Sequence, residues 1–310
     1  MLNRIKVTVP GSIMLMGEHA VLFGHKALAC AVDKYIHIEL EAISARELVI
    51  DSALAQYQSP LSDLVADDRL SFVLAAVAMY ADRLPSGIKI TIRSEFSHTV
   101  GLGSSAAVTA GVVAAIASFV KDETDLGSLF DRSLAVVHQV QDGRGSGTDL
   151  VASIFGSIVS YRVEPREIKA LPALPNISLY YAGYKTKTPD VLKHVEDLAR
   201  YSPELYQQIY QLMGSVTDNA EKEIAKQDWQ QLGQLMNNYQ GLMDALGVAD
   251  KAICDIVYTL RQSEHITGAK ISGSGLGDCV IALGSDPDLS IAYEQIPVSV
   301  SAQGVSIEHY

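Results

Sequence analysis

The chain has 310 residues, 48% of them hydrophobic and 19% charged, which are the proportions of a globular protein with ample material for a core. Its 24 Lys and Arg residues and 36 Asp and Glu residues give a formal net charge of −12, so no nucleic-acid partner is expected, because such partners favour a basic surface. The three cysteines are too widely spaced for a zinc motif or a disulfide framework, and this favours a location in the reducing cytoplasm. No apolar run is long enough to span a bilayer, so no membrane partner is expected.

Short strands with tight turns are predicted for the first forty residues. Apolar and polar residues alternate there, as in strands with one buried face. Pro10-Gly11 and Asp33-Lys34 are predicted to be turns between successive strands. The strands are expected at Val7–Val9, Ile13–Met16, Ala27–Val32 and Ile36–Ile43.

The segment Gly17-Glu18-His19 places two ionisable residues between apolar runs. Such a pair is usually a surface turn. It is also what a polar site at the end of a sheet would present. The sequence leaves both interpretations open.

The stretch from Gly101 to Ser105 lies between a predicted strand, 87–93, and a predicted buried helix, 106–120. Its two glycines lack side chains, so a ligand could approach the main chain there. Its two serines fall at the helix N-terminus, where backbone N–H groups are free and the positive end of the helix dipole points outward. These features predict a phosphate cradle. The simpler alternative is a Ser N-cap on a core helix.

A second glycine-rich segment, Asp142 to Gly156, follows a helix predicted over Leu126–Gln141. Asp149 opens a short apolar helix directly after Gly147 and Thr148. The common use of such a carboxylate is to cap the helix. Beside a phosphate loop, the same group could orient or deprotonate an attacking hydroxyl.

Three prolines between residues 165 and 175 indicate the crossing between two domains, which we place at 1–170 and 171–310. Three amphipathic helices follow in the second domain. Their apolar stripes are predicted to be packing faces. They are expected over residues 203–225, 229–246 and 249–264.

Two further segments of the second half carry candidate chemistry. Lys185 and Lys187 lie in a turn that could either neutralise an anion or simply face solvent. Gly273, Gly275 and Gly277 stand between two apolar strands, where a plain hairpin loop would need fewer glycines. Their spacing predicts a backbone that lies against a ligand.

The three glycine-rich segments, in this order and spacing, resemble the three motifs of the GHMP kinases, the superfamily of galactokinase, homoserine kinase, mevalonate kinase and phosphomevalonate kinase. The resemblance covers nearly the whole chain. The segment Gly17 to Gly24 is most similar to that of mevalonate kinases. Gly277-Asp-Cys279 and Gly145-Ser-Gly147 are closer to phosphomevalonate kinases.

The resemblance implies an α/β fold of two domains with the active site in the cleft between them. The N-terminal domain would have a mixed sheet with helices. The C-terminal domain would have a ferredoxin-like βαββαβ arrangement. The pattern of predicted elements is compatible with both.

The implied activity is transfer of the γ-phosphate of ATP, with Mg²⁺, to the hydroxyl of mevalonate, an isoprenoid precursor. The alternatives are phosphomevalonate or another small alcohol as acceptor, and a catalytically silent binding protein of the same fold. The expected partner is therefore a small molecule. Whether the chain forms a homodimer stays open.

The resemblance assigns roles to individual residues. Asp149 and Ser12 occupy the catalytic positions, and Ser105 and His138 occupy the metal-binding positions. The ATP-phosphate loop consists of Gly101, Leu102, Gly103, Ser104, Ser105 and Ala106. The implied substrate-binding residues are Glu18, His19, Gly147, Thr188, Ser274 and Gly275.

Two of these positions depart from the family pattern. Ser12 stands where the family has a lysine, and a serine cannot supply a charge. His138 stands where the family has an acidic magnesium ligand, and Mg²⁺ prefers oxygen to imidazole nitrogen. The departures predict an altered substrate, slower chemistry or binding without catalysis.

Overall fold

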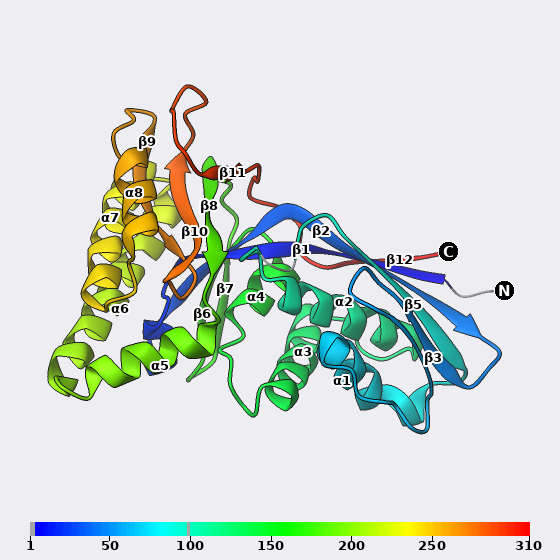
Figure 1. Cartoon of the computed structure of the whole chain (residues 1–310). Coiled ribbons are helices and arrows are strands. Elements are labelled where there is room, and N and C mark those ends of the chain that lie inside the picture. Colours follow the sequence, from blue (N-terminus) through cyan, green and yellow to red (C-terminus); the bar gives the residue numbers. More distant parts are fainter. Residues whose placement is uncertain (1–3, 98–99) are drawn as a thin grey trace.

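The computed structural model describes residues 4–97 and 100–310, and its strands form two separate sheets (Figure 1). The strands of the first sheet are β1 (Arg4–Met16), β2 (Ala27–Ile43), β3 (Glu47–Asp51), β4 (Gln56–Pro60), β5 (Gly87–Ser94), β6 (Ile158–Arg162), β7 (Glu167–Leu171) and β12 (Ser306–His309). Their order is β12-β1-β2-β5-β3-β4, with β6 paired to β2 and β7 paired to β6. All pairs are antiparallel except β3 with β5.

Strand β5 forms as its sequence predicts. Ile88, Ile90 and Ile92 are buried, while Lys89 and Thr91 between them are partly exposed. This alternation places the three isoleucines in the core beneath the sheet. The glycine-rich loop follows the end of this strand. Thr99 of that loop lies outside the described residues.

The two turns predicted near the N-terminus are wrong. Strands β1 and β2 run unbroken through Pro10-Gly11 and Asp33-Lys34. The pairing partner changes from Tyr35 at Pro10 to Val32 at Gly11, so Asp33 and Lys34 are the extra residues of a bulge. A bulge absorbs extra residues without ending the strand, and it bends the strand locally.

Four helices cover one face of the first sheet (Figure 1). Helix α2 is enclosed on almost all sides, because its small residues allow close packing; at Gly111, an added Cβ would lie 2.7 Å from Ile38. Helices α2, α3 and α4 confirm the helices predicted over 106–120, over Leu126–Gln141 and at Asp149. The four are α1 (Ser71–Tyr80), α2 (Ser104–Phe119), α3 (Leu126–Val140) and α4 (Thr148–Phe155), with short 3₁₀ helices at Ala20–Phe23, Asp68–Leu70 and Ala81–Arg83.

The second sheet has four antiparallel strands in the order β11-β8-β10-β9. Numbered along the chain from β8, this order is 4-1-3-2. The strands are β8 (Ile177–Lys185), β9 (Ile266–Ser272), β10 (Gly277–Gly284) and β11 (Glu294–Ile296). Four helices lie between β8 and β9, namely α5 (Thr188–Ala199), α6 (Pro203–Lys226), α7 (Trp229–Ala245) and α8 (Lys251–Leu260).

The implied βαββαβ arrangement is correct for the strands and incomplete for the helices. Residues 285–293, which connect β10 to β11, contain no helix in the structure. Asp286, Pro287 and Asp288 interrupt that connection, and the Asp286 side chain bonds to Ser263 and to a backbone N–H of its own turn. Such local bonds favour a turn over a helix.

Strand β1 belongs to the first sheet, but its end packs into the core of the second half. Ile13, Leu15 and Met16, at the end of β1, are buried in the second core, which the other helices and sheet enclose. The last strand, β12, returns to pair with β1, so both ends of the described chain lie at the same side of the molecule (Figure 1). The proposed division at residue 170 falls within β7 and stays a prediction. No helix in the described ranges is long and apolar enough to cross a membrane.

Candidate active site

Helix α2 begins at a glycine. Its N-cap is Gly103, in the left-handed conformation with φ 63°, and no side chain caps the helix. The alternative of a Ser N-cap is therefore wrong. Ser104 and Ser105 instead form the first turn, whose backbone N–H groups can bind an anion.

Helix α4 begins in the same way. Its N-cap is Gly147, with φ 81° and no side-chain cap, and Asp149 lies in the first turn. The carboxylate of Asp149 accepts a hydrogen bond from the Ser12 hydroxyl at 3.0 Å. Asp149 is thus not a helix cap, because its side chain points to strand β1 instead.

Ser12 is the point where these two helix starts meet. A Cβ atom added to Gly103 would lie 2.0 Å from Ser12 Oγ and 3.5 Å from the Asp149 Cβ. The backbone N–H of Ser12 also donates to the Leu102 carbonyl at 3.0 Å. Strand β1 therefore positions a hydroxyl between the glycine-rich loop and the carboxylate, and the positive ends of two helix dipoles converge there.

The carboxyl group of Asp149 has a raised pKa. Burial is the main cause, and the negative charge of Asp278 adds to it. The Ser12 hydrogen bond and the positive charge of Lys185 act in the opposite direction. A carboxylate with a raised pKa is better matched to accept a proton near neutral pH than an ordinary one.

Asp278 is a site residue that the sequence analysis missed. Its carboxylate lies directly against the glycine-rich loop, since a Cβ on Gly101 would be 2.2 Å from both carboxylate oxygens. Asp278 has φ 68° and is 8% exposed. The only signal in the sequence was an acidic residue placed directly after three alternating glycines.

Lys185 reaches the same place from the end of β8. Its ammonium lies 3.0 Å from Asp278 Oδ2. Next to it, the Thr186 hydroxyl donates to the Leu276 carbonyl at 2.6 Å. These contacts tie the basic turn to the third glycine-rich segment. Thr188 begins α5 and is exposed, and its role in substrate binding stays a prediction.

Two of the three glycines near residue 275 serve packing within the protein. A Cβ on Gly275 would lie 2.6 Å from the Val248 carbonyl, and one on Gly277 would lie 2.7 Å from the Tyr184 ring. This packing is sufficient reason for glycine at both positions, and a backbone that also lies against a ligand there stays a prediction. A Cβ on Gly273 would meet only Asp278, at 3.7 Å, so this glycine alone leaves open space.

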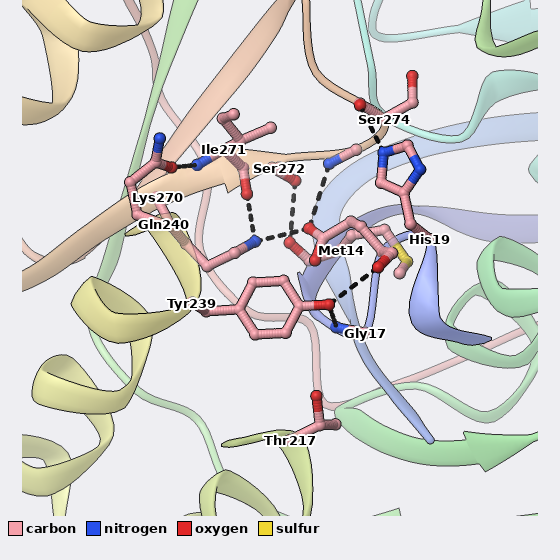
Figure 2. A network of polar contacts seen from close by, with 12 residues as sticks. Met14, Gly17, His19, Thr217, Tyr239, Gln240, Lys270, Ile271, Ser272 and Ser274 are labelled. Atoms are coloured by element: carbon pink, nitrogen blue, oxygen red, sulfur yellow. Dashed lines mark hydrogen bonds and ion pairs between the residues drawn. The ribbon is translucent and has the colours of Figure 1, made fainter. Parts of the chain in front are cut away.

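Glu18 and His19 are internal rather than parts of a surface turn. Glu18 is 3% exposed, and its Oε1 lies 2.6 Å from the ammonium of the fully buried Lys270. His19 Nε2 donates to the Ser274 carbonyl at 2.8 Å, and Figure 2 shows the ring reaching across to that segment. Burial lowers the pKa of His19, so its neutral form makes this bond.

Tyr239 completes this network from helix α7 (Figure 2). Its hydroxyl accepts from the Gly17 N–H at 3.1 Å and donates to the Glu18 carbonyl at 2.9 Å, and Lys270 lies 5.3 Å from the centre of its ring. The network fixes the segment Gly17-Glu18-His19 against the third glycine-rich segment, which contains Ser274. The roles of Glu18, His19, Ser274 and Gly275 in substrate binding stay predictions.

His138 has a partner within the second segment. Its Nε2 donates to the Gly145 carbonyl at 3.1 Å, which orders the loop before α4. Gly147 in that loop packs against α3, where an added Cβ would lie 3.0 Å from Leu134. The described residues hold no group of three or more His, Cys, Asp or Glu side chains placed to bind a metal. Metal binding by His138 and Ser105 stays a prediction.

Two family models match the chain: GHMP kinases N terminal domain over residues 71–157, and GHMP kinases C terminal over residues 220–297. The mevalonate kinase of Thermococcus gammatolerans is 30% identical, and the match covers 93% of this chain and 92% of that protein.

Two solved structures share the fold. The L. major mevalonate kinase in complex with R-mevalonate has a TM-score of 0.75 at 23% identity, and the match covers 92% of this chain and 88% of that one. The Streptococcus pneumoniae phosphomevalonate kinase in complex with phosphomevalonate and AMPPNP has a TM-score of 0.78 at 17% identity, over 91% and 92%. The two TM-scores are similar, so the fold does not distinguish between a mevalonate kinase and a phosphomevalonate kinase.

The family models and the relative from Thermococcus gammatolerans indicate the class of phosphotransferases that act on an alcohol. Within that class, the chain belongs to the GHMP kinase family.

Proposed function

We propose that the protein transfers the γ-phosphate of ATP to the hydroxyl of mevalonate. The observation that carries the chemistry is the Ser12–Asp149 hydrogen bond at the meeting of two glycine-capped helix starts. The choice of acceptor is supported by the relative named mevalonate kinase, which is similar over nearly its whole length.

The arrangement supports a specific division of labour. The N–H groups at the start of α2 bind the phosphates. The acceptor hydroxyl oxygen attacks the γ-phosphorus while the bond to the bridging oxygen breaks, and ADP leaves with that electron pair. Asp149 takes the hydroxyl proton. Ser12 fixes the orientation of the carboxylate and favours its ionised form through the hydrogen bond.

The donor atoms at the start of α2 also fit Mg²⁺. Ser105 is exposed in the first turn and offers a hydroxyl oxygen, the ligand type that Mg²⁺ prefers, and this ion commonly keeps several waters. Ser105 would hold the ion together with nucleotide oxygens. Bound there, Mg²⁺ would neutralise charge on the phosphates. The His138 ring, whose Nε2 bonds to Gly145, would contribute little to that site.

Phosphomevalonate is the second candidate acceptor, because Gly277-Asp-Cys279 resembles the corresponding segment of phosphomevalonate kinases. The experiment that decides is a transfer assay with ATP, Mg²⁺ and a panel of acceptors: mevalonate, phosphomevalonate, homoserine and galactose. We expect mevalonate to give the highest kcat/KM. Higher turnover of phosphomevalonate would favour the second candidate, and binding of ATP with no transfer to any acceptor would favour a silent binding protein.

The Asp149→Asn variant tests the mechanism within this assay. The substitution keeps the shape of the side chain and removes the base. We expect kcat to fall roughly a hundredfold or more, with the affinity for ATP little changed. Near-normal turnover would contradict the role of Asp149.

The setting of this activity is also part of the proposal. We place the protein in the cytoplasm, where ATP is available, and its three cysteines are all free thiols in the structure. Its substrates are small molecules. A homodimer would be detected by the molar mass in solution, and the proposed chemistry needs only one chain.

A further inference from the structure

An ion pair between Lys185 and Asp278 lies beside the glycine-rich loop that begins at Gly101. Asp278 packs its carboxylate on Gly101, and its Oδ2 holds the Lys185 ammonium at 3.0 Å. The Lys185 side chain remains 37% exposed, whereas that of Asp278 is 11% exposed. The positive group of the pair, the Lys185 ammonium, is therefore on the solvent side of the loop.

Asp278 is held in an unusual state. Its backbone is in the left-handed region at φ 68°, which side chains rarely adopt. Its Oδ1 is buried with no hydrogen-bond partner among the described residues. Strained backbone and unpaired buried polar atoms cost free energy, and they occur at functional sites more often than elsewhere.

Lys185 is also the cation that acts on the proposed base. Its positive charge lowers the pKa of Asp149 against the effect of burial, and among the described residues no other cation contributes to that pKa. Ser12, which touches Asp149, carries no charge. Arg144 and Lys187 are both exposed in their loops. One ammonium therefore lies near both the phosphate loop and the carboxylate.

We propose that Lys185 is a catalytic residue whose ammonium contacts the phosphoryl group as it is transferred, and that Asp278 is the residue that positions it. This inference rests on the proposed phosphotransfer at this site. During transfer, negative charge spreads over the three outer oxygens of the phosphoryl group. A cation fixed in advance stabilises that charge without having to reorganise. Asp278 holds the ammonium in place, because it belongs to strand β10 and its carboxylate packs against Gly101.

The first test compares two lysines of one turn. Lys185→Met keeps the length of the side chain and removes the charge, and we expect kcat to fall roughly tenfold to a hundredfold, with a smaller change in the KM for the acceptor. Lys185→Arg should recover part of the loss. Lys187→Met is the matched control, since Lys187 is exposed two residues further on. Equal losses in the two Met variants would overturn the proposal.

The second test separates charge from packing. Without Lys185, the pKa of Asp149 should rise, so the acidic limb of the pH profile of kcat/KM should move to higher pH in Lys185→Met. At a pH above the acidic limb, where Asp149 is ionised in every variant, Asp278→Asn should lower kcat in the parent and have little further effect in Lys185→Met, because Asp278 positions Lys185. An unmoved acidic limb together with additive losses would assign both residues a structural role only.

The third test does not depend on the acceptor. Titration calorimetry gives the affinities for ATP and for ADP in the parent and in Lys185→Met. We expect the variant to lose more affinity for ATP than for ADP, because only ATP carries the phosphoryl group to be transferred. A parent that transfers nothing would refute the proposed function, yet this ratio would still test Lys185. An unchanged ratio with unchanged turnover would overturn the inference and leave the proposed function intact.

Discussion

The Ser12 hydroxyl is the smallest feature on which the proposed chemistry depends. It donates to Asp149 Oδ1, and a hydrogen bond to a carboxylate favours the ionised form. Burial holds the pKa of Asp149 above its ordinary value, and the Ser12 bond limits that rise. The pKa of the base therefore depends in part on a side chain from another element.

Ser12→Ala should raise the pKa of Asp149 further. Because the base must be ionised, activity appears as the pH rises through this pKa, and the acidic limb of kcat/KM should move to higher pH. Ser153→Ala is the control: Ser153 is buried on the same helix α4, and its hydroxyl has no partner within the described residues. A profile that overlays the parent would show that Ser12 does not tune Asp149.

Gly103→Ala should disturb both nucleotide binding and the base. The added Cβ would lie 2.0 Å from Ser12 Oγ, in addition to the strain of an L side chain at φ 63°. We expect a higher KM for ATP and a lower kcat in steady-state kinetics. Gly143→Ala has the same kind of strain, at φ 77°, with nothing within 4 Å of its Cβ. Loss of activity in both variants alike would attribute the effect to backbone strain alone.

At the scale of elements, a buried ion pair fastens β9 to the segment after β1. Lys270 is fully buried, and its ammonium contacts both Glu18 and the Ile271 carbonyl. The Oε2 atom of Glu18 has no partner among the described groups. Removing one charge would therefore leave the other buried and uncompensated.

Lys270→Met should lower the free energy of unfolding by about 3–5 kcal/mol, the usual effect of breaking a buried pair. The double variant Glu18→Leu/Lys270→Met should recover part of this loss, since neither charge remains buried. Urea denaturation measures both. Lys193→Met, which removes an exposed pair with Asp197 on α5, should change little. Additive losses in the double variant would contradict the coupling.

At the scale of the whole molecule, Glu221 connects the second group of helices to the first sheet. Glu221 lies on helix α6 and accepts three hydrogen bonds from the first sheet and its surroundings. The donors are Lys26 directly before β2, Lys169 on β7 and Ser160 on β6. Burial pushes the pKa of Glu221 up, but the bonds and charges of Lys169 and Lys26 outweigh this and lower it to about 2.

This lowered pKa has a defined consequence for stability. The contribution of Glu221 is complete above its ordinary pKa of 4.5 and is lost as the pH falls towards about 2. Glu221→Gln should therefore lower the Tm at pH 7, with the difference from the parent shrinking as the pH falls below 4.5. Glu223→Gln, whose partner Lys226 lies on the same helix, is the control. A pH-independent difference would assign the loss to packing.

The local parts of the site could be predicted from the order of residues along the chain. Glycines before apolar helices predicted the starts of α2 and α4, and Asp149 could be named because its segment carries its own pattern. The period of the apolar residues also predicted β5 and the long helices of the second half. These features depend on neighbours along the chain, so a single sequence contains them.

Which groups meet in the site could not be predicted from the sequence, because it depends on how distant segments pack. Ser12 and Asp149 are 137 positions apart, and Glu18 and Lys270 are 252 apart, so no local pattern could pair them. The same holds for Asp278 against Gly101. Pro10-Gly11 has the local character of a turn, yet it lies within a strand because the partner strand absorbs the mismatch as a bulge. Close approach between distant segments depends on the packing of the whole chain, which local chemistry permits but does not specify.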